Sequence, residues 1–178
     1  MNKQEKYELL CQQVEGLIQG ETNLVGALAN VSAAMKEMFP REFFWVGFYL
    51  VEGSSRSSGS SGSSGSSRSS GSSRSSGQLC LGPFQGTVAC YTIPYGKGVC
   101  GAAWAERKTL VVPDVEAFPG HIACSSLSRS EIVVPVFSSP SEVVAVIDID
   151  STELATFDDT DAHYLEKIAK ILAKELSF

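Results

Sequence analysis

The sequence predicts an α+β fold in which one three-layer α/β/α domain is built around a central antiparallel sheet. Three observations support this class. Apolar residues recur every three or four positions near both ends of the chain, as in amphipathic helices. The middle of the chain holds several short apolar runs of strand length. Two of these runs, 131–138 and 142–151, are separated only by a turn near Pro140, which predicts a hairpin.

Three long helices are predicted. The first covers 4–19 and ends at Gly20. Thr22 or Asn23 caps the second, which runs through about Met38, before Pro40. Asp158 or Asp159 caps the last helix. Its apolar inner face comprises Ala162, Leu165, Ile168, Ala169, Leu172 and Leu176.

Between the helices, strands are expected at about 43–51, 78–82, 87–93 and 109–112, in addition to the hairpin. A short helix is expected from near Gly98 through Arg107. Residues 113–130 are expected to form a long irregular loop. This order of elements gives two helices, a β-meander, a crossing helix, a hairpin and a closing helix.

One segment, Gly53 to Gly77, differs from the rest in composition. It contains 16 Ser, 6 Gly and 3 Arg and has no apolar residue, so it cannot offset the entropy of its own ordering. Because both flanks are strand-like, we expect one domain over 1–178, interrupted by a flexible hairpin-loop insertion at 53–77. The alternative is a phosphorylated or RNA-binding Ser/Arg segment, for which three arginines are sparse.

The charge balance limits the kinds of partner that the protein can bind. The chain has 20 Asp and Glu against 14 Lys and Arg, a net charge of −6, which disfavours a nucleic-acid or anionic-membrane surface. No apolar run approaches the about 18 residues that a membrane span needs, and the N-terminal residues do not resemble a signal peptide. With an odd number of cysteines, these features predict a cytoplasmic protein whose disulfides are transient and catalytic.

Three of the five cysteines are candidate reactive thiols: Cys90, Cys100 and Cys124. Each lies in a segment rich in Gly, Ala or Ser, where backbone N–H groups can stabilise a thiolate. Cys100 is expected at a helix N-terminus, which would lower its pKa. One alternative interpretation is that all three are buried structural thiols. Another is a zinc site with His121, and the lack of any Cys-x-x-Cys pair disfavours it. Cys11 and Cys80 are expected to be small hydrophobic side chains.

A second candidate constellation is acidic. Asp148 and Asp150 lie two apart on a predicted strand and therefore project from the same face. Glu131 opens the adjacent strand. Such carboxylates are costly to bury unless they bind a cation, for which an amino-acid ammonium is suitable. Their proximity should also raise one pKa towards the range of a general acid. The alternative for the pair is a strand end that faces solvent.

A third candidate element is aromatic. Trp45, Gly47 and Tyr49 alternate, so the two rings share one strand face with a gap between them. Such a wall could hold a small apolar group such as a methyl next to sulfur. Ordinary core packing is the competing explanation.

Several motifs together resemble the free methionine-(R)-sulfoxide reductases, which are catalytic members of the GAF-domain superfamily. The resemblance rests on Leu81–Gly86, Gly96–Gly101, Asp114–Val115, Gly120–Cys124, Ser130–Pro135 and Ile147–Ser151. It runs from about Gly20 to the C-terminus and is interrupted only by the Ser-rich segment. It implies a GAF-like domain that reduces free L-methionine (R)-S-oxide to methionine. It also implies that Glu131, Asp148, Asp150 and Trp45 bind the substrate, whereas Tyr49 is left as a candidate.

Sulfoxide reduction needs a thiolate that attacks sulfur, an acid that protonates the departing oxygen and a second thiol that resolves the sulfenic acid. Cys124 is the favoured nucleophile because His121 and Glu131 are near in sequence, and the resemblance also favours it; Cys100 is the alternative. Cys90 is then the resolving thiol, with Cys100 as a second partner or relay. No cofactor or metal is expected, and a thioredoxin-type dithiol is the expected reductant. The sequence also allows a homodimer. The competing function is a non-catalytic GAF-type sensor of a small molecule or of oxidation.

Overall fold

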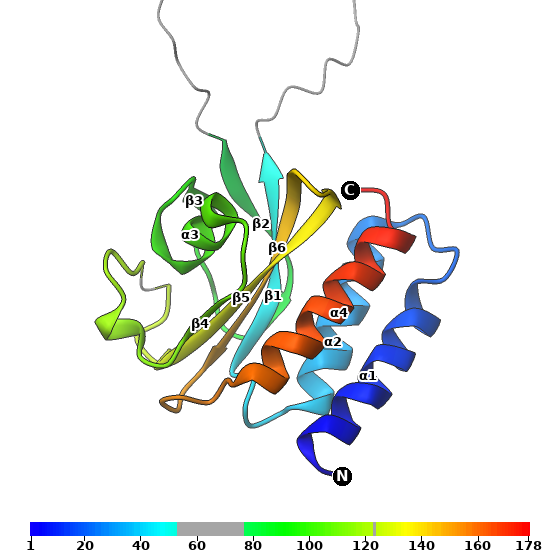
Figure 1. The fold of residues 1–178 in the computed structure, drawn as a ribbon, viewed down its shortest axis with the longest axis horizontal. Helices are drawn as coiled ribbons and strands as arrows, with labels where there is room; N and C mark the ends of the chain where they lie inside the picture. Colours follow the sequence, from blue (N-terminus) through cyan, green and yellow to red (C-terminus); the bar gives the residue numbers. More distant parts are fainter. Residues whose placement is uncertain (53–76, 123) are drawn as a thin grey trace, which may run out of the picture.

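The computed structural model describes residues 1–52, 77–122 and 124–178. Its centre is a six-stranded sheet with the strand order β3-β2-β1-β6-β5-β4, in which every neighbouring pair is antiparallel. Three helices cover one face of this sheet, and one short helix lies over the other (Figure 1). The predicted α+β class and its three layers are therefore confirmed.

The elements follow the predicted order. The helices are α1 (Lys3–Ile18), α2 (Leu24–Met38), α3 (Gly98–Glu106) and α4 (Asp159–Glu175), with a 3₁₀ turn η1 (Val115–Ala117) inside the expected irregular loop. The strands are β1 (Trp45–Glu52), β2 (Gln78–Gln85), β3 (Thr92–Pro94), β4 (Leu110–Val112), β5 (Ser130–Ser139) and β6 (Glu142–Ser151). Within the described residues, no helix is long and apolar enough to cross a membrane.

Side-chain caps fix the helix starts. Asn23 accepts a hydrogen bond from the Gly26 N–H, so it caps α2 in preference to Thr22. Asp158 accepts from the N–H groups of Thr160 and Asp161 and caps α4 in preference to Asp159.

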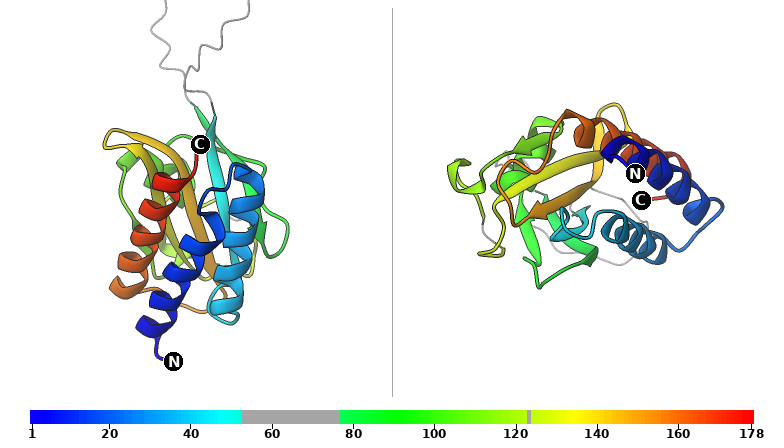
Figure 2. Two further views of the ribbon diagram at one scale, coloured as in Figure 1. Left: turned by 90° about the vertical axis from the view of Figure 1, so that its right-hand side faces the viewer. Right: turned by 90° about the horizontal axis from the view of Figure 1, so that it is seen from below.

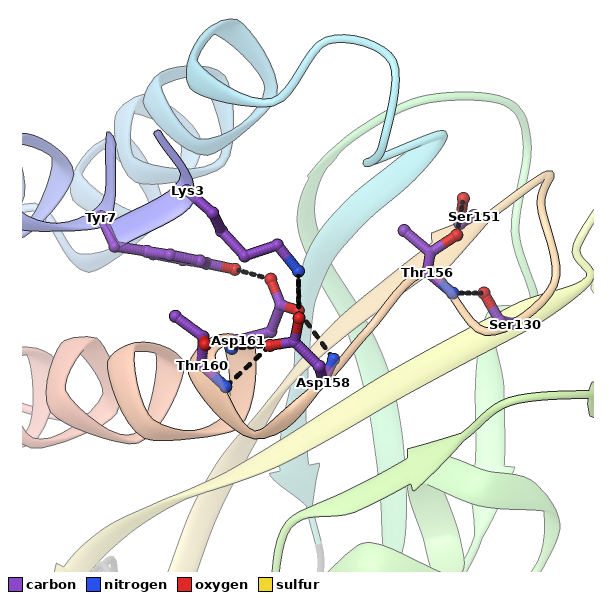
Figure 3. Close-up of polar contacts among 8 residues, drawn as sticks. All are labelled: Lys3, Tyr7, Ser130, Ser151, Thr156, Asp158, Thr160 and Asp161. Atoms are coloured by element: carbon purple, nitrogen blue, oxygen red, sulfur yellow. Dashed lines mark hydrogen bonds and ion pairs between the residues drawn. The ribbon is translucent and has the colours of Figure 1, made fainter. Parts of the chain in front are cut away.

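A cluster of polar side chains joins the first and last helices. Asp161 accepts hydrogen bonds from the Tyr7 hydroxyl at 2.7 Å and from Lys3 Nζ at 2.6 Å. Lys3 Nζ also lies 2.9 Å from Asp158 (Figure 3). These bonds attach the N-terminus of α1 to the N-terminus of α4. Because Asp161 is 2 % exposed, the bonds also satisfy a buried charge.

The strands that flank the Ser-rich segment are paired as expected. Glu52 at the end of β1 lies opposite Gln78 at the start of β2. The predicted loop insertion itself falls almost entirely outside the described residues.

One strand prediction was wrong. Of the expected strand at 87–93, only Thr92 and Ile93 belong to a strand, β3, so Cys90 precedes β3 instead of lying on it. The backbone leaves the sheet at Gly86, whose φ of +143° favours glycine, and a Cβ there would meet the Trp45 ring. Residues 86–91 therefore form a loop outside the strand ladders, and its end is attached to β2 where the Tyr91 carbonyl accepts a hydrogen bond from the Leu81 N–H at 2.9 Å.

The sheet separates two apolar cores. The larger core lies between the sheet and α1, α2 and α4, and Ile147 and Ile149 of β6 point into it. Two views show these three helices side by side on that face (Figure 2). The smaller core, on the α3 side, contains Trp45, Tyr49 and Cys100. Asp148 and Asp150 therefore share one face of β6, as predicted, and this face is the one on the α3 side.

Candidate active site

A small cavity lies on the α3 side of the sheet and collects the predicted site residues. Its walls come from β1, β3, β5, β6, the start of α3 and the loops that precede β3 and β5. Seven of the eight predicted residues line it: Trp45, Tyr49, Cys100, Cys124, Glu131, Asp148 and Asp150. The eighth, Cys90, is bonded to Cys124. The volume of about 30 Å³ has room for a water molecule.

Cys90 and Cys124 form a disulfide with a Cα–Cα distance of 5.5 Å. Both residues are half-buried, whereas Cys11, Cys80 and Cys100 are free. The disulfide joins the loop before β3 to the loop before β5, and both loops line the cavity. The sequence left open whether Cys124 pairs with Cys90 or with Cys100; in this structure its partner is Cys90.

Cys100 sits deeper, as the third residue of α3, and is buried. Its thiol points to Glu131 Oε1 at 3.9 Å. Burial raises the pKa of Cys100 well above its usual range, and the nearby charges of Asp148 and Glu131 raise it further. The expected lowering of its pKa by the helix N-terminus was therefore wrong, because burial and carboxylates outweigh the helix dipole.

The three carboxylates come together through strand register. Glu131 of β5 lies opposite Asp150 of β6, and Asp148 lies two residues along the same strand. Glu131 and Asp148 are each only 6 % exposed. Asp148 Oδ1 is buried without a hydrogen-bond partner, which is rare for a carboxylate oxygen.

These environments shift the carboxyl pKa values upward. Burial raises the pKa of Glu131 and of Asp148 well above the usual range, and repulsion from neighbouring carboxylates adds to this. Burial also raises the pKa of Asp150 to about 6, although a hydrogen bond from Ser128 opposes the shift. The cluster is thus able to hold a proton near neutral pH.

The nearest basic partner does not neutralise the cluster. His121 Nε2 lies 3.7 Å from Glu131 Oε2. Burial lowers the pKa of His121, so the imidazole is mostly neutral at pH 7. Within the part of the chain that the structure describes, no Lys or Arg forms an ion pair with Glu131, Asp148 or Asp150.

The donor atoms of Cys100, Glu131 and Asp148 all lie within 4.8 Å of one another, so a divalent cation could share them. This set differs from the one that the sequence suggested. Cys90 and Cys124 cannot serve as thiolate ligands while they are bonded to each other.

The aromatic wall has the predicted geometry and an additional role. The rings of Trp45 and Tyr49 lie 6.1 Å apart. A Cβ on Gly47 would approach Trp45 Cη2 to 2.8 Å, so the position between the rings requires glycine. Trp45 Nε1 donates to the Thr87 carbonyl at 3.0 Å, and the Tyr49 hydroxyl donates to the Cys90 carbonyl at 3.1 Å. Both rings therefore hold the loop that carries Cys90.

Sequence reasoning missed some contributors. Ser128 is buried against the cavity and hydrogen-bonds Asp150. It lies in a polar loop without periodicity, so only its proximity to Glu131 could have indicated it. Val88 and Ile122 also line the cavity, from the two cysteine loops.

Comparison with known proteins identifies the family to which the chain belongs. Residues 21–176 match the GAF domain family. "GAF domain-containing protein A" of Dictyostelium discoideum is 48 % identical over 96 % of this chain and 92 % of its own length. "Free methionine-R-sulfoxide reductase" of Saccharomyces cerevisiae is 39 % identical over 100 % of this chain and 89 % of its own.

A solved structure extends the comparison. The free methionine-R-sulfoxide reductase from Neisseria meningitidis, in complex with its substrate, superposes with a TM-score of 0.81 at 47 % identity. The alignment covers 98 % of this chain and 90 % of that one. The architecture is thus that of a GAF domain. The chain belongs to the free methionine-R-sulfoxide reductase family of GAF-domain proteins.

Proposed function

We propose that this protein reduces free L-methionine (R)-S-oxide to L-methionine. The observation that carries the proposal is the cavity in which a buried carboxylate cluster without a permanent positive charge adjoins a cysteine pair. The names of its relatives specify the substrate as free methionine-R-sulfoxide. Family membership favours an enzyme over the alternative of a non-catalytic sensor.

The carboxylates supply the reason for a free amino acid. An ammonium group would satisfy Asp148 Oδ1 and offset the repulsion among Glu131, Asp148 and Asp150. A methionine within a peptide has a neutral amide nitrogen in place of this charge. A site built to pair a charge rejects an analogue that lacks it.

In the reaction, the Cys124 thiolate attacks the sulfoxide sulfur while a protonated carboxyl group, Glu131 or Asp148, gives its proton to the oxygen. The resulting hydroxyl group then moves from the substrate sulfur to the Cys124 sulfur as the bond between the two sulfurs breaks, so methionine leaves and Cys124 becomes a sulfenic acid. The Cys90 thiol then attacks this sulfenic acid, which forms the disulfide and releases water. A protein dithiol of the thioredoxin type reduces the disulfide and becomes oxidised itself.

Cys124 is preferred to Cys100 as the nucleophile for an electrostatic reason. The raised pKa of Cys100 keeps it a thiol at neutral pH, and the thiol is a poor nucleophile. Cys124 lines the cavity and forms the disulfide with Cys90. The relay role of Cys100, a cytoplasmic location and a homodimer stay predictions from the sequence.

Single-turnover experiments test the cysteine roles. Pre-reduced protein is mixed with free methionine (R)-sulfoxide without a reductant, and released methionine is counted per protein molecule. We expect wild type and Cys90→Ser to release about one equivalent and Cys124→Ser to release none. If Cys100→Ser releases none and Cys124→Ser releases a full equivalent, Cys100 is the nucleophile.

A blocked substrate tests the carboxylate role. N-acetylmethionine (R)-sulfoxide should be turned over at least 100-fold less efficiently than the free amino acid, a difference of about 3 kcal/mol. Comparable kcat/KM values for the two substrates would exclude ammonium binding by the cluster.

A further inference from the structure

Exposed apolar side chains gather around the disulfide. Val88 and Tyr91, which flank Cys90, are 86 % and 83 % exposed, and Ile122 and Leu127, which flank Cys124, are 36 % and 56 % exposed. We call these four residues the disulfide rim. Each of them is within three residues of a disulfide cysteine, and the two cysteine Cα atoms are only 5.5 Å apart. Chain geometry therefore keeps the rim within about 11 Å of one Cα of the disulfide.

The rim is also free of formal charge. Residues 86–92 and 121–128 contain no Asp, Glu, Lys or Arg, although the whole chain carries a net charge of −6. Their one imidazole, that of His121, has a pKa that burial lowers. Clustered, uncharged apolar side chains on a charged protein are typical of a surface that contacts a partner.

The two sulfurs of the disulfide differ in their surroundings. Cys124 lines the cavity together with the carboxylates, whereas Cys90 does not line it. Cys90 instead lies between the two most exposed side chains of the rim. Cys90 is therefore the sulfur that adjoins the exposed rim outside the cavity, whereas Cys124 faces the cavity where the sulfoxide would bind.

We propose that the disulfide rim is the docking surface for the protein dithiol that reduces this enzyme, and that the dithiol attacks Cys90. The proposal rests on the proposed function, which requires two electrons from outside after every turnover. The incoming thiolate forms a mixed disulfide with Cys90 and displaces Cys124 as a thiolate. The second thiol of the partner then attacks the mixed disulfide, which leaves the partner oxidised and Cys90 reduced.

The surface fits this partner better than a membrane or a permanent subunit. A protein surface that binds an anionic membrane carries basic residues, and the two rim segments have no Lys or Arg. A few apolar side chains around a reactive bond suit the small interfaces of transient redox encounters. Attack at Cys90 also returns the Cys124 thiolate directly to the cavity, where the next sulfoxide binds.

A reductant comparison tests the surface. Tyr91→Asp and Leu127→Asp place a charge on the rim without altering a cavity-lining residue. Leu9→Asp on α1, where Leu9 is 45 % exposed, is the matched control. With thioredoxin, its reductase and NADPH, we expect the rim variants to lose at least 10-fold in kcat/KM for thioredoxin. With dithiothreitol, they should stay within twofold of wild type, as the control should with both reductants.

The outcomes separate this proposal from the proposed function. An equal loss with thioredoxin and dithiothreitol, or no loss with either, overturns the docking surface. Failure of the pre-reduced wild type to release its first equivalent of methionine would instead refute the proposed function.

A trapping experiment tests the choice of sulfur. Oxidised enzyme is mixed with a thioredoxin variant whose second active-site cysteine is replaced by serine, so that the mixed disulfide persists. Peptide mapping should find thioredoxin on Cys90. Trapping predominantly on Cys124 overturns the assignment.

Discussion

Two groups of carboxylates in this protein each contain a deeply buried aspartate, and they differ in the partners of that aspartate. On the helix side, Asp161 is 2 % exposed and is bonded to a lysine and a tyrosine hydroxyl. On the α3 side, Asp148 is 6 % exposed and leaves one oxygen without a partner. We call Asp158 and Asp161 the paired cluster. We call Glu131, Asp148 and Asp150 the unpaired cluster.

The difference follows from what each cluster does. Lys3 Nζ and the Tyr7 hydroxyl satisfy the paired cluster, which attaches α1 to the cap of α4 (Figure 3). The unpaired cluster retains the cost of desolvation and repulsion, which appears as raised pKa values for Glu131 and Asp148. A cost that persists in the folded state is typical of a site that completes its contacts with a ligand.

The largest expected effect is that of Asp148→Asn, which should lower activity without lowering stability. Because the amide cannot pair an ammonium, kcat/KM for free methionine (R)-sulfoxide should fall about 100-fold or more. The free energy of unfolding should stay the same or rise by about 1 kcal/mol, because a buried carboxylate is neutralised. Steady-state kinetics and urea denaturation measure both. A variant that loses stability and keeps its activity would show that Asp148 is structural.

Asp161→Ala should show the opposite pattern. It removes the acceptor of a buried tyrosine hydroxyl and of Lys3, so unfolding should become easier by about 2–3 kcal/mol. Activity per folded molecule should stay within twofold of wild type. Asp159 is exposed and is the first residue of α4, so Asp159→Ala is the matched control. It should lower the free energy of unfolding by less than about 1 kcal/mol. Equal effects of the two substitutions would show that the paired cluster is not what stabilises α4.

The raised pKa of Asp150 in the unpaired cluster should make the free energy of unfolding fall as the pH rises. The pKa of Asp150 is raised to about 6 from an ordinary value near 3.8, so the folded state holds its proton more tightly than the unfolded state. Stability from this group falls as pH rises from about 4 to 6, by about 1–2 kcal/mol. Asp150→Asn should therefore gain stability relative to wild type between pH 4 and pH 7. A constant difference across this range would contradict the raised pKa.

The smallest effect is expected at the exposed edge of the paired cluster. Lys3 lowers the pKa of Asp158 to about 2, so this pair contributes stability above about pH 4 and loses it as pH falls towards 2. Because the Asp158 side chain is 58 % exposed, the contribution should be under about 1 kcal/mol. Because Lys3 also pairs with Asp161, a double-mutant cycle of Lys3→Met and Asp158→Asn isolates this pair, and its coupling free energy should be under about 1 kcal/mol at pH 7 and smaller at pH 2. High salt should also reduce the coupling, and a coupling that grows in acid would contradict the pairing.

Local sequence patterns predicted most of the fold and much of the site. Apolar periodicity and capping residues predicted the helix ends to within a few residues. Of the two candidate caps of α4, Asp158 is the correct one. Alternation along β6 placed Asp148 and Asp150 on one face and the two isoleucines on the other. The same argument placed Trp45 and Tyr49 together.

The errors share a different cause. The segment with Cys90 has a strand-like composition, but long-range hydrogen bonds from Trp45 and Tyr49 hold it as a loop. Cys100 does sit in the first turn of α3, but its burial beside Glu131 reverses the expected pKa shift. Neither the bonds nor the burial has a local pattern in the sequence.

The sequence by itself determined the order of the elements, the faces of the strands and which side chains could do chemistry, because these depend on neighbours a few residues away. Only the tertiary structure decided that Cys124 pairs with Cys90 and that Asp148 lacks a partner. It also decided that burial governs the thiol and carboxyl pKa values. Desolvation and pairing depend on which distant segments the fold brings together, and a linear pattern does not record that.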